Sequence, residues 1–194
     1  MARRQQRRHA SPVRPWVVLL VWVAIIWGHS LMPGDTSSAE SSVFIGLAQK
    51  AIYAIYQQHF ALFDRLAAAH PHFLLSLTDP EVMHFYVRKA GHFSEYFVLA
   101  CLTLNAARRT LPGPVWGTIV TLLFWTATPC VDEWIQLHVP GRAGAPIDVL
   151  IDMAGFGTGL ALGLVAWAVC AAIAGMFGLL TGSLGSHGDE LEPW

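Results

Sequence analysis

Long apolar runs separated by short polar segments dominate this chain. Three ranges, 15–34, 110–131 and 153–188, contain no Asp, Glu, Lys or Arg. Each is long enough to cross a bilayer as a helix, which takes about 20 residues. A fourth apolar stretch, near 91–107, includes two polar residues, His92 and Glu95. The pattern predicts four transmembrane helices, near residues 15–32, 90–108, 114–135 and 149–172.

The segment 33–89, between the first two predicted spans, is more polar. Apolar residues recur at helical spacing through 41–69, with Lys50 and Arg65 among the charged residues between them. This spacing predicts an amphipathic helix that lies on the membrane or caps the bundle. Asp79 followed by Pro80 is typical of a helix start, and we expect that helix to continue into the second span. The predicted fold class is an all-α integral membrane protein, a four-transmembrane-helix bundle with an extra amphipathic extracytoplasmic helix.

The positions of Lys and Arg predict the orientation. The range 1–14 is rich in arginine and has no acid, and Arg108 and Arg109 close the second span. The positive-inside rule places both regions in the cytoplasm. The insert 33–89 and the loop 136–147 are then extracytoplasmic. The chain divides into a basic cytoplasmic N-terminus (1–14), a membrane domain (15–180) and a cytoplasmic tail (181–194), so both termini are inside.

The first span has a signal peptide as its alternative, because a basic segment precedes an apolar one. Gly28-His29-Ser30 is a poor cleavage site, so we prefer an uncleaved anchor.

Composition narrows the classes of function. Apolar residues make up 54% of the chain and charged residues 13%, against about 25% charged in soluble domains. This balance argues against a nucleic-acid partner and predicts that the protein lies in the lipid bilayer. A homo-oligomer is also compatible with the sequence. The three cysteines, Cys101, Cys130 and Cys170, fit neither a disulfide framework nor a zinc site by their spacing.

One stripe of the second predicted helix is polar. Arg88, His92 and Glu95 follow one another at i, i+4 and i+7, so they lie on one helix face, with Lys89 beside them. A charge inside a membrane segment costs about 2.5–3.5 kcal/mol. These residues therefore need a structural or functional explanation.

Further polar residues lie at the ends of the third and fourth predicted helices. The third ends with Asp132, Glu133 and Gln136, Arg142 is in the following loop, and the fourth starts near Asp148 and Asp152. Gly155, Gly159 and Gly163 continue the fourth helix as a repeated G-x-x-x-G pattern, which allows close helix packing. The predicted topology brings all of these residues to the outer face. The predicted ligand-binding residues are Arg88, Lys89, His92, Glu95, Asp132, Glu133, Gln136, Arg142, Asp148 and Asp152.

The charges of this cluster do not balance. Its acids are Glu95, Asp132, Glu133, Asp148 and Asp152, and its bases are Arg88, Lys89 and Arg142. Two negative charges remain if every acid ionises and His92 is neutral. Protonated carboxylates, a protonated His92 or a bound cation would each restore balance. We predict no cofactor or metal, with a divalent cation as an alternative.

Three sequence blocks resemble the VanZ family of small bacterial membrane proteins. They are Ser30-Leu-Met-Pro-Gly34, Arg88-Lys-Ala-Gly-His-Phe-Ser-Glu-Tyr96, and Asp132-Glu-Trp-Ile-Gln136 followed by Val139-Pro-Gly-Arg142, Asp148, Gly155 and Gly159. Asp152 stands where relatives often have Asn. The resemblance covers about 27–165 and implies a multi-pass protein of the bacterial inner membrane. The name-giving member is associated with resistance to the glycopeptide teicoplanin.

Four hypotheses for function follow. The preferred one is a non-catalytic protein whose outer-face cluster binds or protects a cell-envelope component, such as a lipid-linked cell-wall precursor, with a link to glycopeptide resistance. The second is a membrane enzyme acting on a lipid or phosphate head group, with His92 as acid or base and Glu95 or Asp132 orienting it. A structural ion-pair network without a ligand is the third, and a transporter ranks last.

Overall fold

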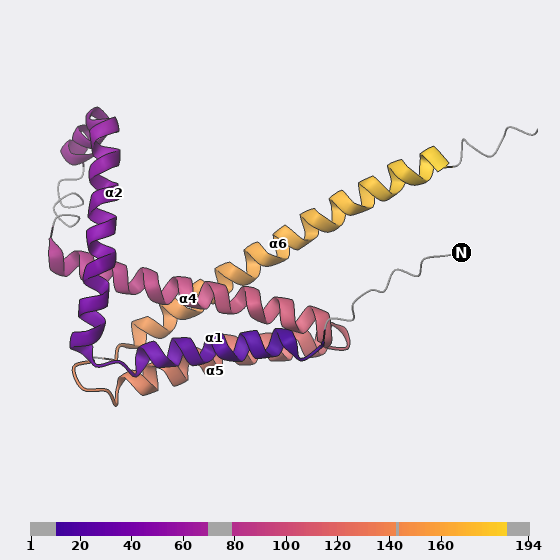
Figure 1. The fold of residues 1–194 in the computed structure, drawn as a ribbon, viewed down its shortest axis with the longest axis horizontal. Helices are drawn as coiled ribbons and strands as arrows, with labels where there is room; N and C mark the ends of the chain where they lie inside the picture. The colour runs from indigo at the N-terminus through magenta and orange to yellow at the C-terminus, as the bar shows by residue number, and fades with distance from the viewer. Residues whose placement is uncertain (1–10, 70–78, 143, 186–194) are drawn as a thin grey trace, which may run out of the picture.

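The computed structural model describes residues 11–69, 79–142 and 144–185, and helices are the only regular elements in these ranges. In chain order they are α1 (Arg14–Ser30), α2 (Gly34–Ala69), α4 (Pro80–Thr110), α5 (Gly113–Gln136) and α6 (Pro146–Gly185). α1 and α5 run side by side, α4 and α6 cross next to them, and α2 turns away from the bundle (Figure 1). The all-helical class is therefore confirmed. Most of the predicted basic N-terminus and of the predicted acidic tail lies outside the described residues.

Proline and capping residues set the helix boundaries. Asp79 Oδ1 accepts a hydrogen bond from the Glu81 backbone N–H at 2.9 Å, and Pro80 opens α4. Proline suits the first turn because its missing N–H has no partner there in any helix. Gly113 has a φ of +83°, which suits glycine in the tight turn between α4 and α5. The predicted start of α4 at Asp79 and Pro80 is confirmed, and α4 is unbroken to Thr110.

Two helices are long and apolar enough to cross a membrane: α5, and the part Pro146–Phe177 of α6. α1 meets the same standard only together with residues Gly34–Leu66 of α2, to which it is bent by 103°. The described residues therefore contain two candidate spans, or three with this bent pair. That α1 and α4 each cross the membrane, which would make four spans, remains a prediction.

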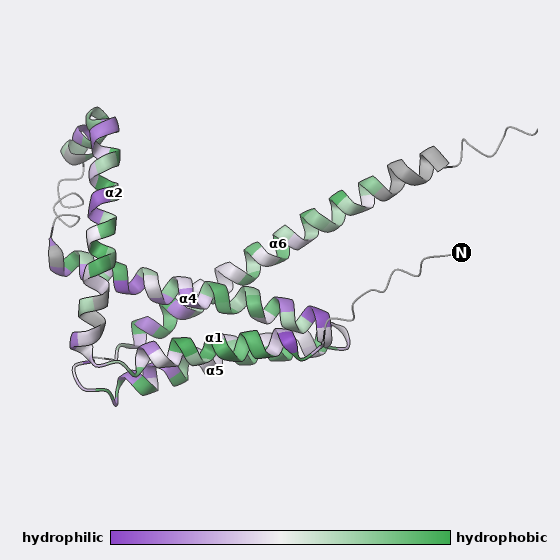
Figure 2. Ribbon diagram, in the orientation of Figure 1, coloured by the Kyte–Doolittle hydropathy of each residue, from purple (hydrophilic) through white to green (hydrophobic). Residues whose placement is uncertain are grey.

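The surface of the helices is strongly apolar. None of the most apolar window of α6 is buried inside the protein, and Figure 2 shows hydrophobic residues along α1 and the projecting part of α6. An apolar surface of this extent is unfavourable in water and is typical of a membrane protein.

α2 differs from the expected capping helix. It begins at Gly34, where the Gly34 backbone N–H donates to the Pro140 carbonyl at 3.2 Å, and its backbone leaves helical geometry at His59. Ser41 and Ile45 are buried, but Leu47, Tyr53 and Phe60 farther along the helix are exposed. Figure 1 shows the helix projecting from the bundle. The contact between Gly34 and the loop after α5 thus directs α2 outward, and the residues of α2 that are described as buried lie in its first half.

Tryptophan indoles connect the helices. Trp22 Nε1 donates to the Glu95 carbonyl at 2.9 Å, and Trp16 Nε1 donates to Thr110 Oγ1 at 2.8 Å, so both attach α1 to α4. Trp125 Nε1 donates to the Met153 carbonyl at 2.9 Å and connects α5 to α6. Partly buried indole N–H groups need such acceptors. The apolar core between α1, α4 and α6 consists of Leu19, Val23, Ile26, Tyr96, Leu99, Ala100 and Phe156.

The glycine stripe of α6 packs directly on α4. A Cβ added at Gly155 would lie less than 3.0 Å from the Phe93 carbonyl, and one added at Gly159 would lie equally close to the Phe97 carbonyl. At Gly163 the added atom would meet a Leu104 methyl group at 2.9 Å. The glycines therefore let the two helix backbones approach closely, as the G-x-x-x-G pattern predicts.

We expect Gly159→Ala to lower the free energy of unfolding by about 1–3 kcal/mol, because the added methyl group must push α6 away from the α4 backbone. Gly157→Ala is the matched control, since its Cβ would meet only Trp125 Cζ2, at 3.7 Å. Thermal unfolding of the two variants in detergent micelles measures the difference. Equal losses of stability would contradict the proposed contact.

Candidate binding site at the polar end of the bundle

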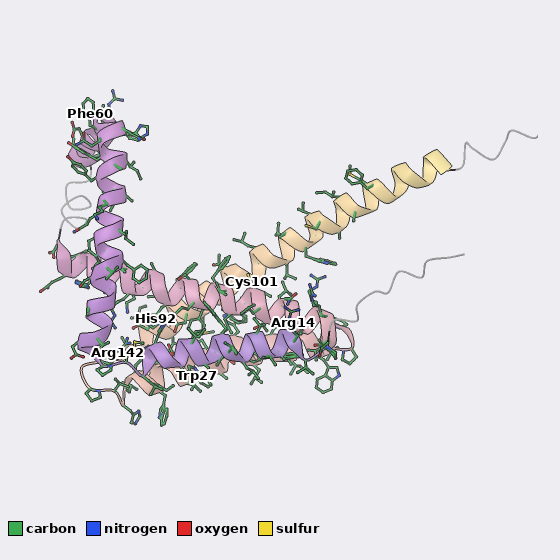
Figure 3. All side chains as sticks on the ribbon, in the orientation of Figure 1. Arg14, Trp27, Phe60, His92, Cys101 and Arg142 are labelled. Atoms are coloured by element: carbon green, nitrogen blue, oxygen red, sulfur yellow. The ribbon has the colours of Figure 1, made fainter. Side chains whose placement is uncertain are left out.

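Four helices bring polar residues together at one end of the bundle. His92 on α4 and Arg142 in the loop after α5 lie close together in Figure 3, whereas Arg14, at the start of α1, lies at the opposite end. The last turn of α1, the last turn of α5 and the first two turns of α6 meet α4 there. The site has a buried layer within the bundle and a cavity beside it.

Two aspartates and a histidine form the centre of the buried layer. His92 Nδ1 lies 3.2 Å from Asp152 Oδ1 and 3.9 Å from Asp132 Oδ2. Both aspartates are only 1% exposed. Ser30 Oγ donates to Asp132 Oδ1 at 2.5 Å, and Gln136 Nε2 donates to Asp132 Oδ2 at 3.3 Å. Three helices thus hold the Asp132 carboxylate in one orientation.

A buried ion pair closes the same layer on one side. Lys89 Nζ contacts Asp148 Oδ1, and the Asp148 side chain is 2% exposed against 16% for Lys89. The Lys89 ammonium also lies 5.1 Å from the centre of the Phe85 ring. Glu133 is buried as well, and its carboxylate lies against Gly144 in the loop before α6. Lys89, Glu133 and Asp148 therefore belong to the interior.

A cavity of about 620 Å³ lies beside the buried layer. It is lined by residues of α1, α2, α4 and the α5–α6 loop, namely His29, Ser30, Ser41, Phe44, Ala48, Val87, Arg88, Ala90, Gly91, His92, Ser94, Glu95 and Arg142. The stripe Arg88, His92 and Glu95 forms its α4 wall, as the helical spacing predicts. His92 belongs both to this wall and to the buried layer.

The two arginines of the cavity have different surroundings. Arg142 Nη2 donates to the His29 carbonyl at 2.6 Å, and Arg142 Nε donates to the Met32 carbonyl at 3.1 Å, so this side chain holds the end of α1. No carboxylate of residues 11–69, 79–142 or 144–185 forms an ion pair with Arg88. Glu95 Oε1 instead lies 2.7 Å from His29 Nδ1. Among the described residues, the Arg88 guanidinium group therefore has no ion-pair partner, and it lines the cavity.

The structure divides the ten predicted ligand-binding residues between the two layers. Arg88, His92, Glu95 and Arg142 line the cavity, whereas Lys89, Asp132, Glu133, Gln136, Asp148 and Asp152 are in the interior. Sequence reasoning placed His29 and Ser30 at the same outer face but did not include them, or Ser41, among the ligand-binding residues. The polar residues His29 and Ser30 at the end of an apolar helix could have been assigned to the site from the sequence. Ser41 could not, because its position depends on the turn between α1 and α2.

Lys89→Met should lower the free energy of unfolding by about 3 kcal/mol or more, because it leaves the buried Asp148 carboxylate without its counter-charge. The double variant K89M/D148N should regain most of this loss, since it removes the pair together. Chemical unfolding in detergent micelles measures both variants. A loss in the double variant that equals the sum of the losses in Lys89→Met and Asp148→Asn would show that the residues are not coupled.

Of three comparisons with known proteins, one identifies the family of this chain. A search of curated proteins and a search of solved structures each found no match. A family model described as VanZ/LLP1 matches residues 15–168, a range that contains the buried layer, the cavity and the glycine stripe. The chain therefore belongs to the VanZ/LLP1 family.

Proposed function

We propose that this membrane protein binds an anionic or zwitterionic head group of a cell-envelope component, such as a lipid-linked cell-wall precursor, in the 620 Å³ cavity. The Arg88 guanidinium in the cavity wall, which has no ion-pair partner among the described residues, carries the proposal. An arginine fork matches the oxygens of a phosphate or carboxylate with two parallel hydrogen bonds. Arg142, on the α5–α6 loop, supplies a second positive charge to the same cavity.

The size and lining of the cavity fit a lipid-borne group. Its volume lies within the range of about 300–1,000 Å³ that is usual for small-molecule sites. Phe44, Ala48 and Val87 add apolar wall next to the charged residues. A head group on the arginines would therefore leave its apolar chain next to apolar surface.

The charge distribution supports an outward-facing cavity. Arg14, Arg108 and Arg109 lie at the helix ends that are opposite to the cavity. The positive-inside rule places those ends in the cytoplasm. The cavity then faces outward from the bacterial inner membrane, where cell-wall precursors and glycopeptides meet, and a role in glycopeptide resistance is part of this proposal.

One contact favours an enzyme as the second candidate. His92 lines the cavity while its Nδ1 lies 3.2 Å from Asp152 Oδ1, an arrangement in which a carboxylate orients an imidazole for proton transfer. The expected orienting residue differs: Glu95 Oε1 lies beside His29, and Asp132 Oδ2 is the more distant partner at 3.9 Å. Binding remains the preferred function.

We expect Arg88→Ala to weaken binding of a lipid-linked cell-wall precursor by about 10- to 100-fold, since a hydrogen-bonded charge pair contributes about 1.5–3 kcal/mol. Binding to the full chain in lipid nanodiscs measures the effect. Arg109→Ala is the control, because Arg109 is an exposed arginine at the other end of α4. Arg88→Lys should retain part of the affinity.

Two readouts accompany that titration. Cells that produce Arg88→Ala at the wild-type level should lose any protection from teicoplanin that the wild-type chain gives. Incubation of the wild type with the precursor should leave the precursor intact, and release of phosphate that His92→Gln abolishes would favour the enzyme instead. Equal precursor affinity of wild type, Arg88→Ala and Arg109→Ala would refute the binding proposal.

A further inference from the structure

His92, Asp132 and Asp152 come from three different helices and converge on one point. One ligand atom from each, an imidazole nitrogen or a carboxylate oxygen, lies within 4.8 Å of the others. α4, α5 and α6 contribute one residue each, so the packing of the bundle creates the cluster. Nitrogen and carboxylate oxygen together are donors that zinc and other divalent transition metals accept.

The spacing of the donors matches a metal centre. Zn–N and Zn–O bonds of about 2.0–2.2 Å place two tetrahedral ligands about 3.3–3.6 Å apart. His92 Nδ1 lies 3.2 Å from Asp152 Oδ1 and 3.9 Å from Asp132 Oδ2. Movements of a few tenths of an ångström would bring these two distances into the tetrahedral range, and the ligand oxygens of Asp132 and Asp152 lie within 4.8 Å of each other.

The second Asp152 oxygen provides independent support. Asp152 is 1% exposed, and no group of the described residues donates a hydrogen bond to its buried Oδ2. A buried carboxylate oxygen without a donor is costly. A divalent cation between the two aspartates would neutralise both carboxylates, and binding through both Asp152 oxygens would also give Oδ2 a partner.

We propose that His92, Asp132 and Asp152 bind one divalent transition-metal ion, with Zn²⁺ as its representative. Ser30 and Gln136 act as positioning residues, because their hydrogen bonds to Asp132 fix the carboxylate orientation. Three protein ligands leave a zinc ion with an open position. Since His92 also lines the cavity, the ion would lie in the layer next to the cavity.

The metal site goes beyond the proposed head-group binding and does not depend on it. Its ligands are interior residues apart from His92, whereas Arg88 carries the head-group proposal. Metal binding is therefore measured without any precursor, and Arg88→Ala should keep the ion while it loses the head group. If the metal proposal fails, Zn²⁺ does not bind; if the head-group proposal fails, the precursor does not bind. The two failures are therefore distinguishable.

The experiment loads the detergent-solubilised full chain, stripped with a chelator, with Zn²⁺ and measures bound metal, affinity and thermal stability. We expect one ion per chain and a higher Tm with Zn²⁺, because an ion that binds only the folded state stabilises it. His92→Gln and Asp152→Asn should each weaken binding by at least about 100-fold, and Ser30→Ala by about tenfold. Co²⁺ in place of Zn²⁺ should give a visible absorption spectrum that His92→Gln changes.

The matched controls are His138→Gln and Asp35→Asn, an exposed histidine and an exposed aspartate outside the cluster. Both should bind Zn²⁺ as the wild type does. Substoichiometric binding by the wild type, an unchanged Tm with Zn²⁺, or equal affinity in Asp152→Asn would overturn the proposal. In that case a protonated His92 between the two carboxylates explains the cluster, and Zn²⁺ should leave the Tm of the wild type unchanged.

Discussion

The close approach of α4 and α6 is the contact on which the site depends. Gly155 and Gly159 present no side chain to the Phe93 and Phe97 carbonyls, so the two backbones touch. Asp152 lies nearly one turn before Gly155, on the same face of α6. The glycine contact therefore sets the depth at which this carboxylate meets His92. A wider helix separation would leave the aspartates of α6 buried but out of reach of the basic residues of α4, which is the most costly arrangement for a charge.

Burial of these carboxylates is compatible with folding because each has a specific neighbour. Asp148 contacts Lys89, Asp132 accepts from Ser30 and Gln136, and Asp152 lies beside His92. Such contacts offset the loss of hydration without adding much net stability. What they provide is a fixed register of α1, α4, α5 and α6 at one end of the bundle, and the cavity next to them takes its shape from that register.

The sequence predicted the parts of the site that helix geometry alone determines. The i, i+4, i+7 spacing placed Arg88, His92 and Glu95 on one face, and the glycine pattern identified the face of α6 that packs. Helical periodicity could not predict that Lys89 turns to the interior while Arg88 lines the cavity, since adjacent residues differ by only about 100° and the partner helix decides between them. It also could not place Ser41, because that depends on the bend between α1 and α2.

The acidic and basic residues of the cluster lie in different parts of the site. Asp148 pairs with Lys89 at one edge of the site, and Glu95 contacts His29 at another. The arginines are at the cavity, whereas Asp132, Asp152 and Glu133 are in the interior. An anion in the cavity is attracted by Arg88 and repelled by the aspartates behind His92. The divalent cation proposed between those aspartates would neutralise both carboxylates and so remove the repulsion. The two layers therefore favour opposite charges, and a cation in the interior layer would favour an anion in the cavity.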